Sequence, residues 1–123
     1  MKDTIFKELR PVLWTEKLDE SIGVYCGILG FRCMEKNEAW GWASLQRDGV
    51  GIMLAKPNAH IGFTEPRFTG SLYITVANVD ALWNNVKDKL ELVYAPEDFP
   101  WEMREFAVYD NNGYILQFGQ PLT

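Results

Sequence analysis

LDESIGVYCGILGF, residues 18–31, is the stretch of this sequence that decides its fold. Its large apolar side chains recur at the spacing of one helix face: Leu18, Ile22, Tyr25 and Leu29. Gly30 follows the last of them, and glycine commonly stands just after a helix end because it adopts positive φ without steric cost. The stretch therefore predicts an amphipathic helix over residues 17–29.

The same arrangement returns in the second half of the chain, where Val79 opens a second helix 61 positions after Leu18. Its apolar residues at helical spacing are Val79, Leu82, Trp83, Val86 and Leu90. Each helix has one expected strand before it and three after it. These strands are expected at residues 9–15, 31–35, 40–46 and 50–55, and then at 71–77, 91–94, 105–110 and 114–118. Segments 56–70 and 95–101 are expected to be loops, because turn-forming residues interrupt them.

This doubled order predicts one α+β domain over residues 1–123, with internal repeats at about 9–56 and 71–118. Each repeat is a βαβββ unit, and the two are expected to form a cupped mixed sheet with the helices on its outer face. Alternation along the strands then assigns side chains to the two faces. The residues expected beneath the helices are Leu9, Pro11, Leu13, Leu72, Ile74, Val76, Tyr114, Leu116 and Phe118. The residues expected on the inner face are Arg10, Val12, Trp14, Ser71, Tyr73, Thr75, Ile115 and Gln117. Such a mixture of rings and polar groups is typical of a ligand cavity.

Composition narrows the classes of function. The chain has 17 acidic and 12 basic residues and a net charge of -5, which argues against binding to nucleic acid phosphates. That charge suits either solubility or attraction of a cationic ligand. No apolar run approaches the roughly 20 residues of a membrane span, and the first residues do not resemble a signal peptide. We therefore expect a cytoplasmic protein without membrane contact, in which Cys26 and Cys33 are reduced thiols.

Three motifs resemble the vicinal oxygen chelate superfamily, which includes glyoxalase I, extradiol dioxygenases and the fosfomycin- and bleomycin-resistance proteins. They are LDESIGVYCGILGF, ITVANVDALW and DNNGYILQF, and together they extend over nearly the whole chain. PWEMREFAVYDNNGYILQF further resembles the tail of bleomycin-resistance proteins, in which a Pro-Trp-Gly run precedes Arg-Glu-Phe-Ala. Glu102 and Met103 depart from that pattern by lengthening the run.

The resemblance implies four metal-binding positions, which the motifs and the repeat place at Arg10, Ala55, Ser71 and Gln117. A guanidinium cannot bind a metal, alanine offers no donor, and a serine hydroxyl is a poor ligand. Gln117 alone would hardly hold an ion, and His60 has no partner at ligand spacing. We therefore expect a binding protein without metal, cofactor or catalysis. The alternatives are a metal-dependent lyase or dioxygenase of the glyoxalase type, and a binder of an unrelated metabolite.

By the same resemblance, the protein is expected to sequester a flat or cationic antibiotic-like ligand, such as a bleomycin-type compound, in an aromatic cleft at a homodimer interface. The candidate ligand-binding residues are Trp40, Trp42, Phe63, Phe68, Tyr73, Trp101, Glu102 and Gln117. In DFPWEMREF, residues 98–106, two roles are expected for Trp101. Its ring either stacks on a ligand, with acidic residues around the binding site, or covers the edge of the hydrophobic core. Arg104 is expected to pair with Glu102 or Glu105. An N-terminal strand exchanged between subunits, with Pro11 near the exchange point, is a further expectation.

Overall fold

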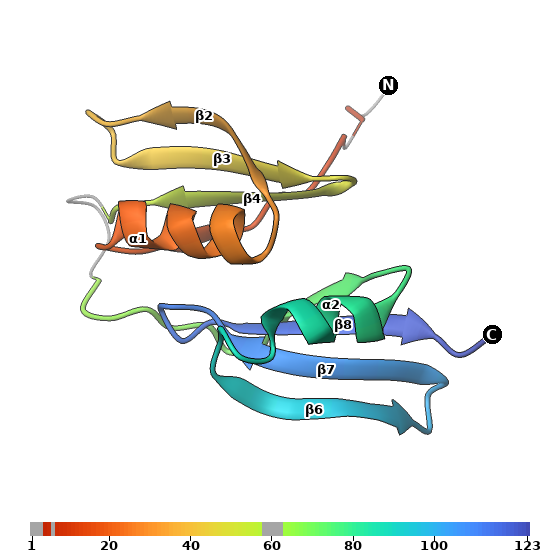
Figure 1. Ribbon diagram of the computed structural model, residues 1–123. Helices are drawn as coiled ribbons and strands as arrows, with labels where there is room; N and C mark the ends of the chain where they lie inside the picture. The colour runs from red at the N-terminus through yellow and green to blue at the C-terminus, as the bar shows by residue number, and fades with distance from the viewer. Residues whose placement is uncertain (1–3, 6, 58–62) are drawn as a thin grey trace.

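The computed structural model describes residues 4–5, 7–57 and 63–123, and its first module is a βαβββ unit (Figure 1). The module consists of β1 (Val12–Trp14), α1 (Leu18–Ile22), β2 (Arg32–Asn37), β3 (Trp42–Arg47) and β4 (Val50–Ala55). A π-helical segment, η1 (Gly23–Ile28), continues α1 without a break. The second module repeats the order with β5 (Leu72–Thr75), α2 (Val79–Val86), β6 (Leu92–Phe99), β7 (Met103–Tyr109) and β8 (Ile115–Pro121). The α+β class and the two repeats are thus confirmed.

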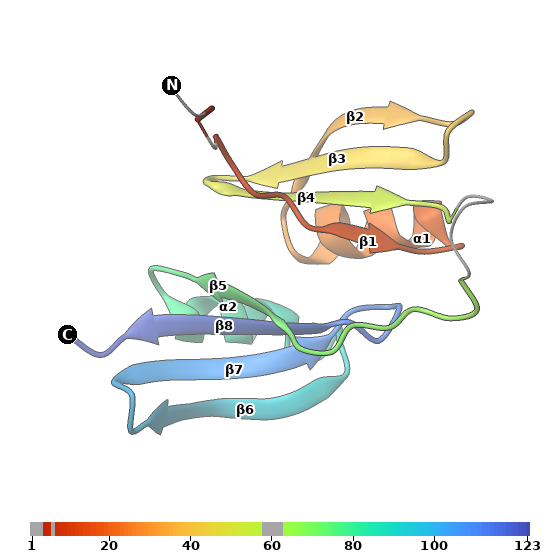
Figure 2. The same cartoon turned by 180° about the vertical axis from the view of Figure 1, so that it is seen from behind.

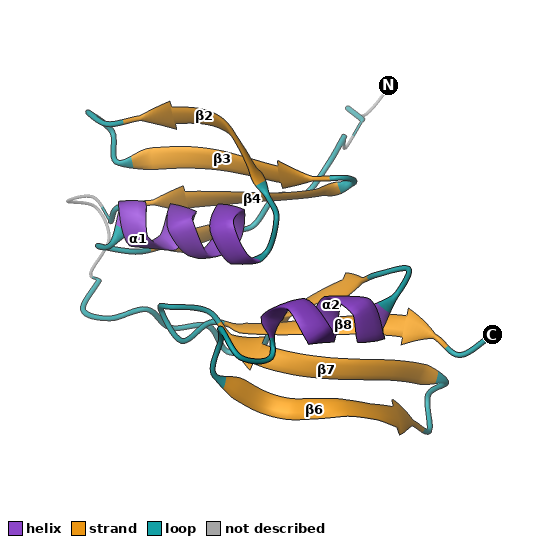
Figure 3. Ribbon diagram, viewed as in Figure 1, coloured by secondary structure: helices purple, strands orange, loops and turns teal. Residues whose placement is uncertain are grey.

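Each module has one four-stranded mixed sheet, with strand orders β1-β4-β3-β2 and β5-β8-β7-β6. The pairs β1–β4 and β5–β8 are parallel, and the other pairs are antiparallel. Both helices cover the same side of the two sheets (Figure 3), and the reverse view shows the opposite faces of the sheets without helices (Figure 2). We call this helix-free side the concave face. Among the described residues, no helix is long and apolar enough to cross a membrane.

The core lies between the helices and the sheets, and it follows the predicted alternation of side chains. Leu13, Tyr114, Leu116 and Phe118 are buried, and the partly buried residues Leu72, Ile74 and Val76 pack against them. Leu9 contradicts the prediction, because it is 94% exposed. The first strand begins only at Val12, so the alternation of a strand does not extend back to residue 9.

Polar contacts connect the two modules through the turn between β7 and β8. The Tyr25 hydroxyl donates to the Asp110 carboxylate at 2.7 Å, and both side chains are buried. The Tyr114 hydroxyl donates to the Trp14 carbonyl at 2.7 Å. Burial raises the pKa of Asp110, although hydrogen bonds from Tyr25 and from nearby backbone N–H groups oppose the rise. These contacts fix the second module against the first helix.

The segment 95–101 is not the predicted loop. Strand β6 continues to Phe99, which pairs with Met103, and the chain reverses in a tight turn where Glu102 has a positive φ of 63°. Strand β6 lies at the edge of its sheet, and an edge strand tolerates Pro96 because one side of its backbone needs no ladder partner. Trp101 therefore lies at the tip of a hairpin.

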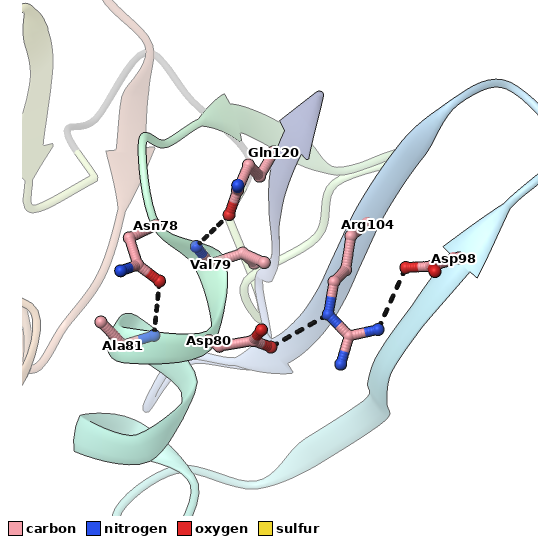
Figure 4. A network of polar contacts seen from close by, with 7 residues as sticks. All are labelled: Asn78, Val79, Asp80, Ala81, Asp98, Arg104 and Gln120. Carbon is pink, nitrogen blue, oxygen red and sulfur yellow. Dashed lines mark hydrogen bonds and ion pairs between the residues drawn. The ribbon is translucent and has the colours of Figure 1, made fainter. Parts of the chain in front are cut away.

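The N-terminal end of α2 contacts this hairpin and the end of β8 (Figure 4). Asn78 accepts a hydrogen bond from the Ala81 N–H at 3.0 Å and so caps the helix, while the Val79 N–H donates to Gln120 at 2.9 Å. Arg104 pairs with Asp80 and Asp98, each at 3.0 Å. The prediction that Arg104 pairs with Glu102 or Glu105 is wrong, because consecutive strand residues point to opposite faces and Arg104 lies on the helix side.

Candidate functional site

The concave face of the second sheet carries a buried carboxylate surrounded by hydrogen-bond donors. Glu105 is only 1% exposed. It accepts from the Tyr73 hydroxyl at 2.9 Å, from the Trp101 indole N–H at 2.9 Å and from the Gln117 amide at 3.3 Å. The Tyr94 hydroxyl is its fourth donor. We call these five residues the Glu105 cluster.

Strand alternation places Glu105 at this position. Its neighbour Phe106 is fully buried in the core, so Glu105 must point to the concave face. The register of β5 against β8 sets Tyr73 opposite Gln117, and the tight hairpin turn brings Trp101 back over β7. Gly119 allows Tyr73 to cross β8, since a Cβ atom at residue 119 would lie 2.7 Å from the tyrosine Cζ.

The electrostatics of the cluster favour an ionised carboxylate and protonated phenols. Burial opposes ionisation of Glu105, but the hydrogen bonds from Tyr94, Trp101, Tyr73 and Gln117 outweigh it and hold its pKa below the usual range. Burial and the hydrogen bond to Glu105 raise the pKa of Tyr73 to about 12, and the same two causes raise the pKa of Tyr94. At neutral pH the cluster therefore holds one negative charge beneath neutral aromatic rings.

Aromatic rings extend from the cluster along the β6–β7 hairpin. Phe99 stacks on Trp101 with a centroid separation of 4.7 Å and an interplanar angle of 11°, and Tyr94 meets Phe99 edge-on at 5.6 Å. Trp101 is 59% exposed and Tyr73 is 44% exposed. Exposed flat rings stack on planar ligands and attract cations to their faces. The charge of Glu105 reinforces that attraction.

The structure brings together only some of the predicted ligand residues. Tyr73, Trp101 and Gln117 meet in the Glu105 cluster. Glu102 is exposed at the hairpin turn, and Phe68 is exposed in the segment before β5. Glu105 does not lie beside Glu102 at the rim of the hairpin. It is buried at the centre of the cluster, where it cannot act as a surface partner of Arg104.

The other predicted aromatic residues lie in the first module or in the segment that follows it. Trp42 opens β3, and Phe63 packs edge-on against Trp14 with centroids 6.2 Å apart. Trp40 does not share the face of β3, because it lies in the turn before that strand and is 71% exposed. Sequence reasoning missed Tyr94 and Phe99, which it placed at a strand end and in a loop. Had the predicted strand extended to residue 99, both side chains would have been assigned to a strand beside the cluster.

The predicted metal positions hold a donor set that does not suit a metal ion. Ser71 donates to the Gln117 side-chain oxygen, and the Gln117 amide nitrogen donates to the Tyr94 hydroxyl at 2.9 Å. The strand register also differs from the expected one. Val12 and Tyr73 are equivalent residues of the two modules; Val12 pairs with Met53, and Tyr73 pairs with Gln117. In the first module the counterpart of Gln117 is therefore Met53 and not Ala55. Among the described residues, no group of three or more His, Cys, Asp or Glu side chains suits a metal ion. His60 lies outside the described residues.

A cavity of about 520 Å³ lies elsewhere, between the two modules beside α2. Its apolar lining includes Leu29, Phe31, Ile74, Leu82 and Phe118. None of the five residues of the Glu105 cluster is among the described residues that line it. The cluster and its rings remain the better candidate site, because four hydrogen-bond donors converge there on one buried carboxylate beside exposed rings.

Comparisons with solved structures support the fold. A protein from Agrobacterium tumefaciens str. C58 has a TM-score of 0.82 and 20% identity, with 98% of each chain covered. TioX from Micromonospora sp. ML1 has a TM-score of 0.79 and 19% identity, with 95% of this chain and 100% of that chain covered.

A third similar structure is a bleomycin-binding protein from bleomycin-producing Streptomyces verticillus, complexed with copper(II)-bleomycin. Its TM-score is 0.70 at 22% identity, with 94% of this chain and 97% of that chain covered. None of the curated proteins matches this sequence. A family model matches residues 9–118, and the chain therefore belongs to the Glyoxalase/Bleomycin resistance protein/Dioxygenase superfamily.

Proposed function

We propose that this protein binds a flat, cationic small molecule at the Glu105 cluster and sequesters it without chemical change. The observation that carries the proposal is the hydrogen bond from the Trp101 indole to the buried Glu105 carboxylate. It orients an exposed ring and places a negative charge at the edge of that ring. A cation over such a ring gains about 0.5–2 kcal/mol, and stacking adds a similar amount.

The protonation state of the cluster favours binding over catalysis. Glu105 already accepts four hydrogen bonds, which occupy the lone pairs that a general base or a metal ligand would need. The raised pKa values of Tyr73 and Tyr94 keep both phenols protonated at neutral pH. We infer that the protein is a non-catalytic binder that uses neither metal nor cofactor.

A bleomycin-type antibiotic is the first ligand to test, because one protein of the same fold is a bleomycin-binding protein. Sequestration of such a compound would confer antibiotic resistance. We expect this to happen in the cytoplasm, whose reducing conditions suit the free thiols Cys26 and Cys33.

We further infer that two copies associate as a homodimer and enclose the concave faces. Exposed apolar side chains on that side support this, among them Val12, Tyr73 and Trp101. The segment before β1 carries the exposed residues Ile5 and Leu9, which suits an arm exchanged between subunits. Sedimentation velocity tests the dimer, and a monomer at micromolar concentration would refute it.

Calorimetric titration with metal-free bleomycin tests the function. We expect micromolar binding by the wild type, at least tenfold weaker binding by Trp101→Ala, and an intermediate loss for Trp101→Phe, which keeps the stacked ring but loses the N–H donor. Gly27→Ala is the control, because a Cβ atom there meets nothing within 4 Å. If folded wild type binds no bleomycin, or if Trp101→Ala binds as tightly, the proposal fails. Elemental analysis after dialysis tests the metal, and one divalent ion per chain would contradict us.

A further inference from the structure

The concave face of the first sheet carries a different set of side chains, arranged in rows by strand register. Trp42, Ala55 and Trp14 form one row across β3, β4 and β1. Ser44, Met53 and Val12 form the next row. Gln46 and Gly51 form the third, and the Arg10 side chain lies against Gly51. Two indole rings thus lie at one end of this face and a guanidinium at the other.

Contacts with neutral groups hold the Arg10 guanidinium in place. It donates to the Ser44 hydroxyl at 2.8 Å and to the Gln46 side-chain oxygen at 3.2 Å. A Cβ atom at residue 51 would lie 3.0 Å from the Arg10 Nε, so glycine makes room for the flat group. Because neither hydrogen-bonding partner is charged, the positive charge of Arg10 is not neutralised within the sheet.

The acid beside Arg10 comes from the segment before β1. The Glu8 carboxylate lies 3.2 Å from the Arg10 Nε, and its side chain is 64% exposed. That nitrogen is buried but makes no hydrogen bond among the described residues, so the geometry of the ion pair is poor. Glu35, which pairs with Ser44 from β2, is exposed on the same sheet. Glu8 marks where a carboxylate approaches the guanidinium, and because its own side chain is largely exposed and its geometry with Arg10 is poor, another carboxylate can displace it.

The aromatic end and the charged end of this face together suit an elongated molecule with a ring system at one end and a carboxylate at the other. Arg10 lies two residues before β1 and Trp14 is the last residue of that strand, and four residues of extended chain span at most about 13 Å. Trp14 and Trp42 flank the small Ala55 across two strand spacings of roughly 10 Å in total, and Phe63 packs edge-on against Trp14. Met53 and Val12 provide an apolar floor between the rings and the charge. A guanidinium binds a carboxylate through two parallel hydrogen bonds.

We propose that the concave face of the first sheet is a binding site for an elongated aromatic carboxylate. Its carboxylate displaces Glu8 and pairs with Arg10, and its ring system packs against Trp14 and Trp42. This site has the opposite charge preference to the Glu105 cluster and rests on residues of the first module alone. It therefore stands whether or not the Glu105 cluster binds a cation.

Calorimetric titration with biphenyl-4-carboxylate tests the proposal, and the neutral biphenyl-4-carboxamide serves as its matched control. We expect the carboxylate to bind at least about tenfold more tightly than the amide, because a hydrogen bond to a charged group is worth at least that factor. Arg10→Gln removes this preference. Gly51→Ala weakens it by displacing the guanidinium while retaining the charge. Glu8→Gln strengthens binding of the carboxylate, because it removes the competing acid.

Several outcomes would overturn the proposal. They are an absence of binding to the folded wild type at millimolar carboxylate, equal affinities for acid and amide, and an unchanged affinity in Arg10→Gln. Thermal unfolding followed by circular dichroism shows whether each variant is folded. If Arg10→Gln does not fold, the affinity of Glu8→Gln for the carboxylate tests the proposal independently. Trp101→Ala should bind biphenyl-4-carboxylate as the wild type does. If Trp101→Ala lost the carboxylate, the ligand would lie at the Glu105 cluster and the assignment to Arg10 would be wrong.

Discussion

Gly119 lies where the Tyr73 side chain crosses β8 to reach Glu105, and Gly119→Ala should break that contact. A Cβ atom at residue 119 would stand 2.7 Å from the tyrosine Cζ and 3.1 Å from the Met103 Cε. No real Cβ atom tolerates the first distance, so the phenol must swing away. Glu105 then loses one of its four donors while it remains buried.

The size of the effect follows from the bond that is lost. A hydrogen bond to a charged group contributes about 1.5–3 kcal/mol, and we expect the lower half of that range because Tyr73 is 44% exposed. Alanine recovers about 0.5 kcal/mol or more through its lower backbone entropy. The net loss of unfolding free energy is therefore about 1–2 kcal/mol, or roughly 3–10 °C in Tm for a chain of this size. Gly27→Ala, with the same atom added in open space, should not lower the Tm.

The pH dependence of this loss provides an independent check. Glu105 has a lowered pKa in the folded state, so its contribution to stability is complete above the unfolded pKa and is lost as the pH falls through the folded pKa. The stability difference between wild type and Gly119→Ala should therefore shrink below about pH 4. Ultraviolet titration should show one tyrosine pKa falling from about 12 toward its ordinary value in the variant. Unchanged stability together with an unchanged tyrosine titration would refute this account of the cluster.

Three further substitutions test other contacts. Trp101→Phe removes the indole donor to Glu105 but keeps the stacked ring, and it should lower the unfolding free energy in urea by about 1 kcal/mol; a larger loss would mean that the ring is part of the core. Tyr25→Phe leaves the buried Asp110 carboxylate with one donor fewer, and it should cost about 1–3 kcal/mol in the same assay, whereas a neutral result would show that the contact between the modules contributes nothing. Arg104→Gln breaks two exposed ion pairs and should cost less than about 1 kcal/mol, with the difference disappearing in 1 M salt; a loss that persists there would not be electrostatic.

Local patterns in the sequence were sufficient to predict the repeated architecture. The spacing of Leu18, Ile22, Tyr25 and Leu29 predicts a helix wherever it occurs, because helix periodicity depends only on neighbouring residues. Alternation along the last strand likewise predicted that Tyr114, Leu116 and Phe118 are buried. It also pointed Tyr73 and Gln117 to the concave face, where both lie in the Glu105 cluster.

Other features depended on which strands are neighbours. The prolines and acids of segment 95–101 predicted a loop, but β6 is an edge strand and needs only one ladder partner, so the strand continues to Phe99. The partners of Arg104, Asp80 and Asp98, lie on α2 and β6. No spacing in the sequence indicates either pair, because both form across elements that only the folded sheet brings together.

The sequence by itself determined two βαβββ units, their helices and the sides of β1, β5 and β8 that face the core, since these follow from backbone geometry repeated along the chain. Only the tertiary structure decided that Glu105 is a buried anion held by Tyr73, Tyr94, Trp101 and Gln117. Those four donors come from β5, β6, the hairpin turn and β8, and a carboxylate can be buried only where enough donors converge to replace water.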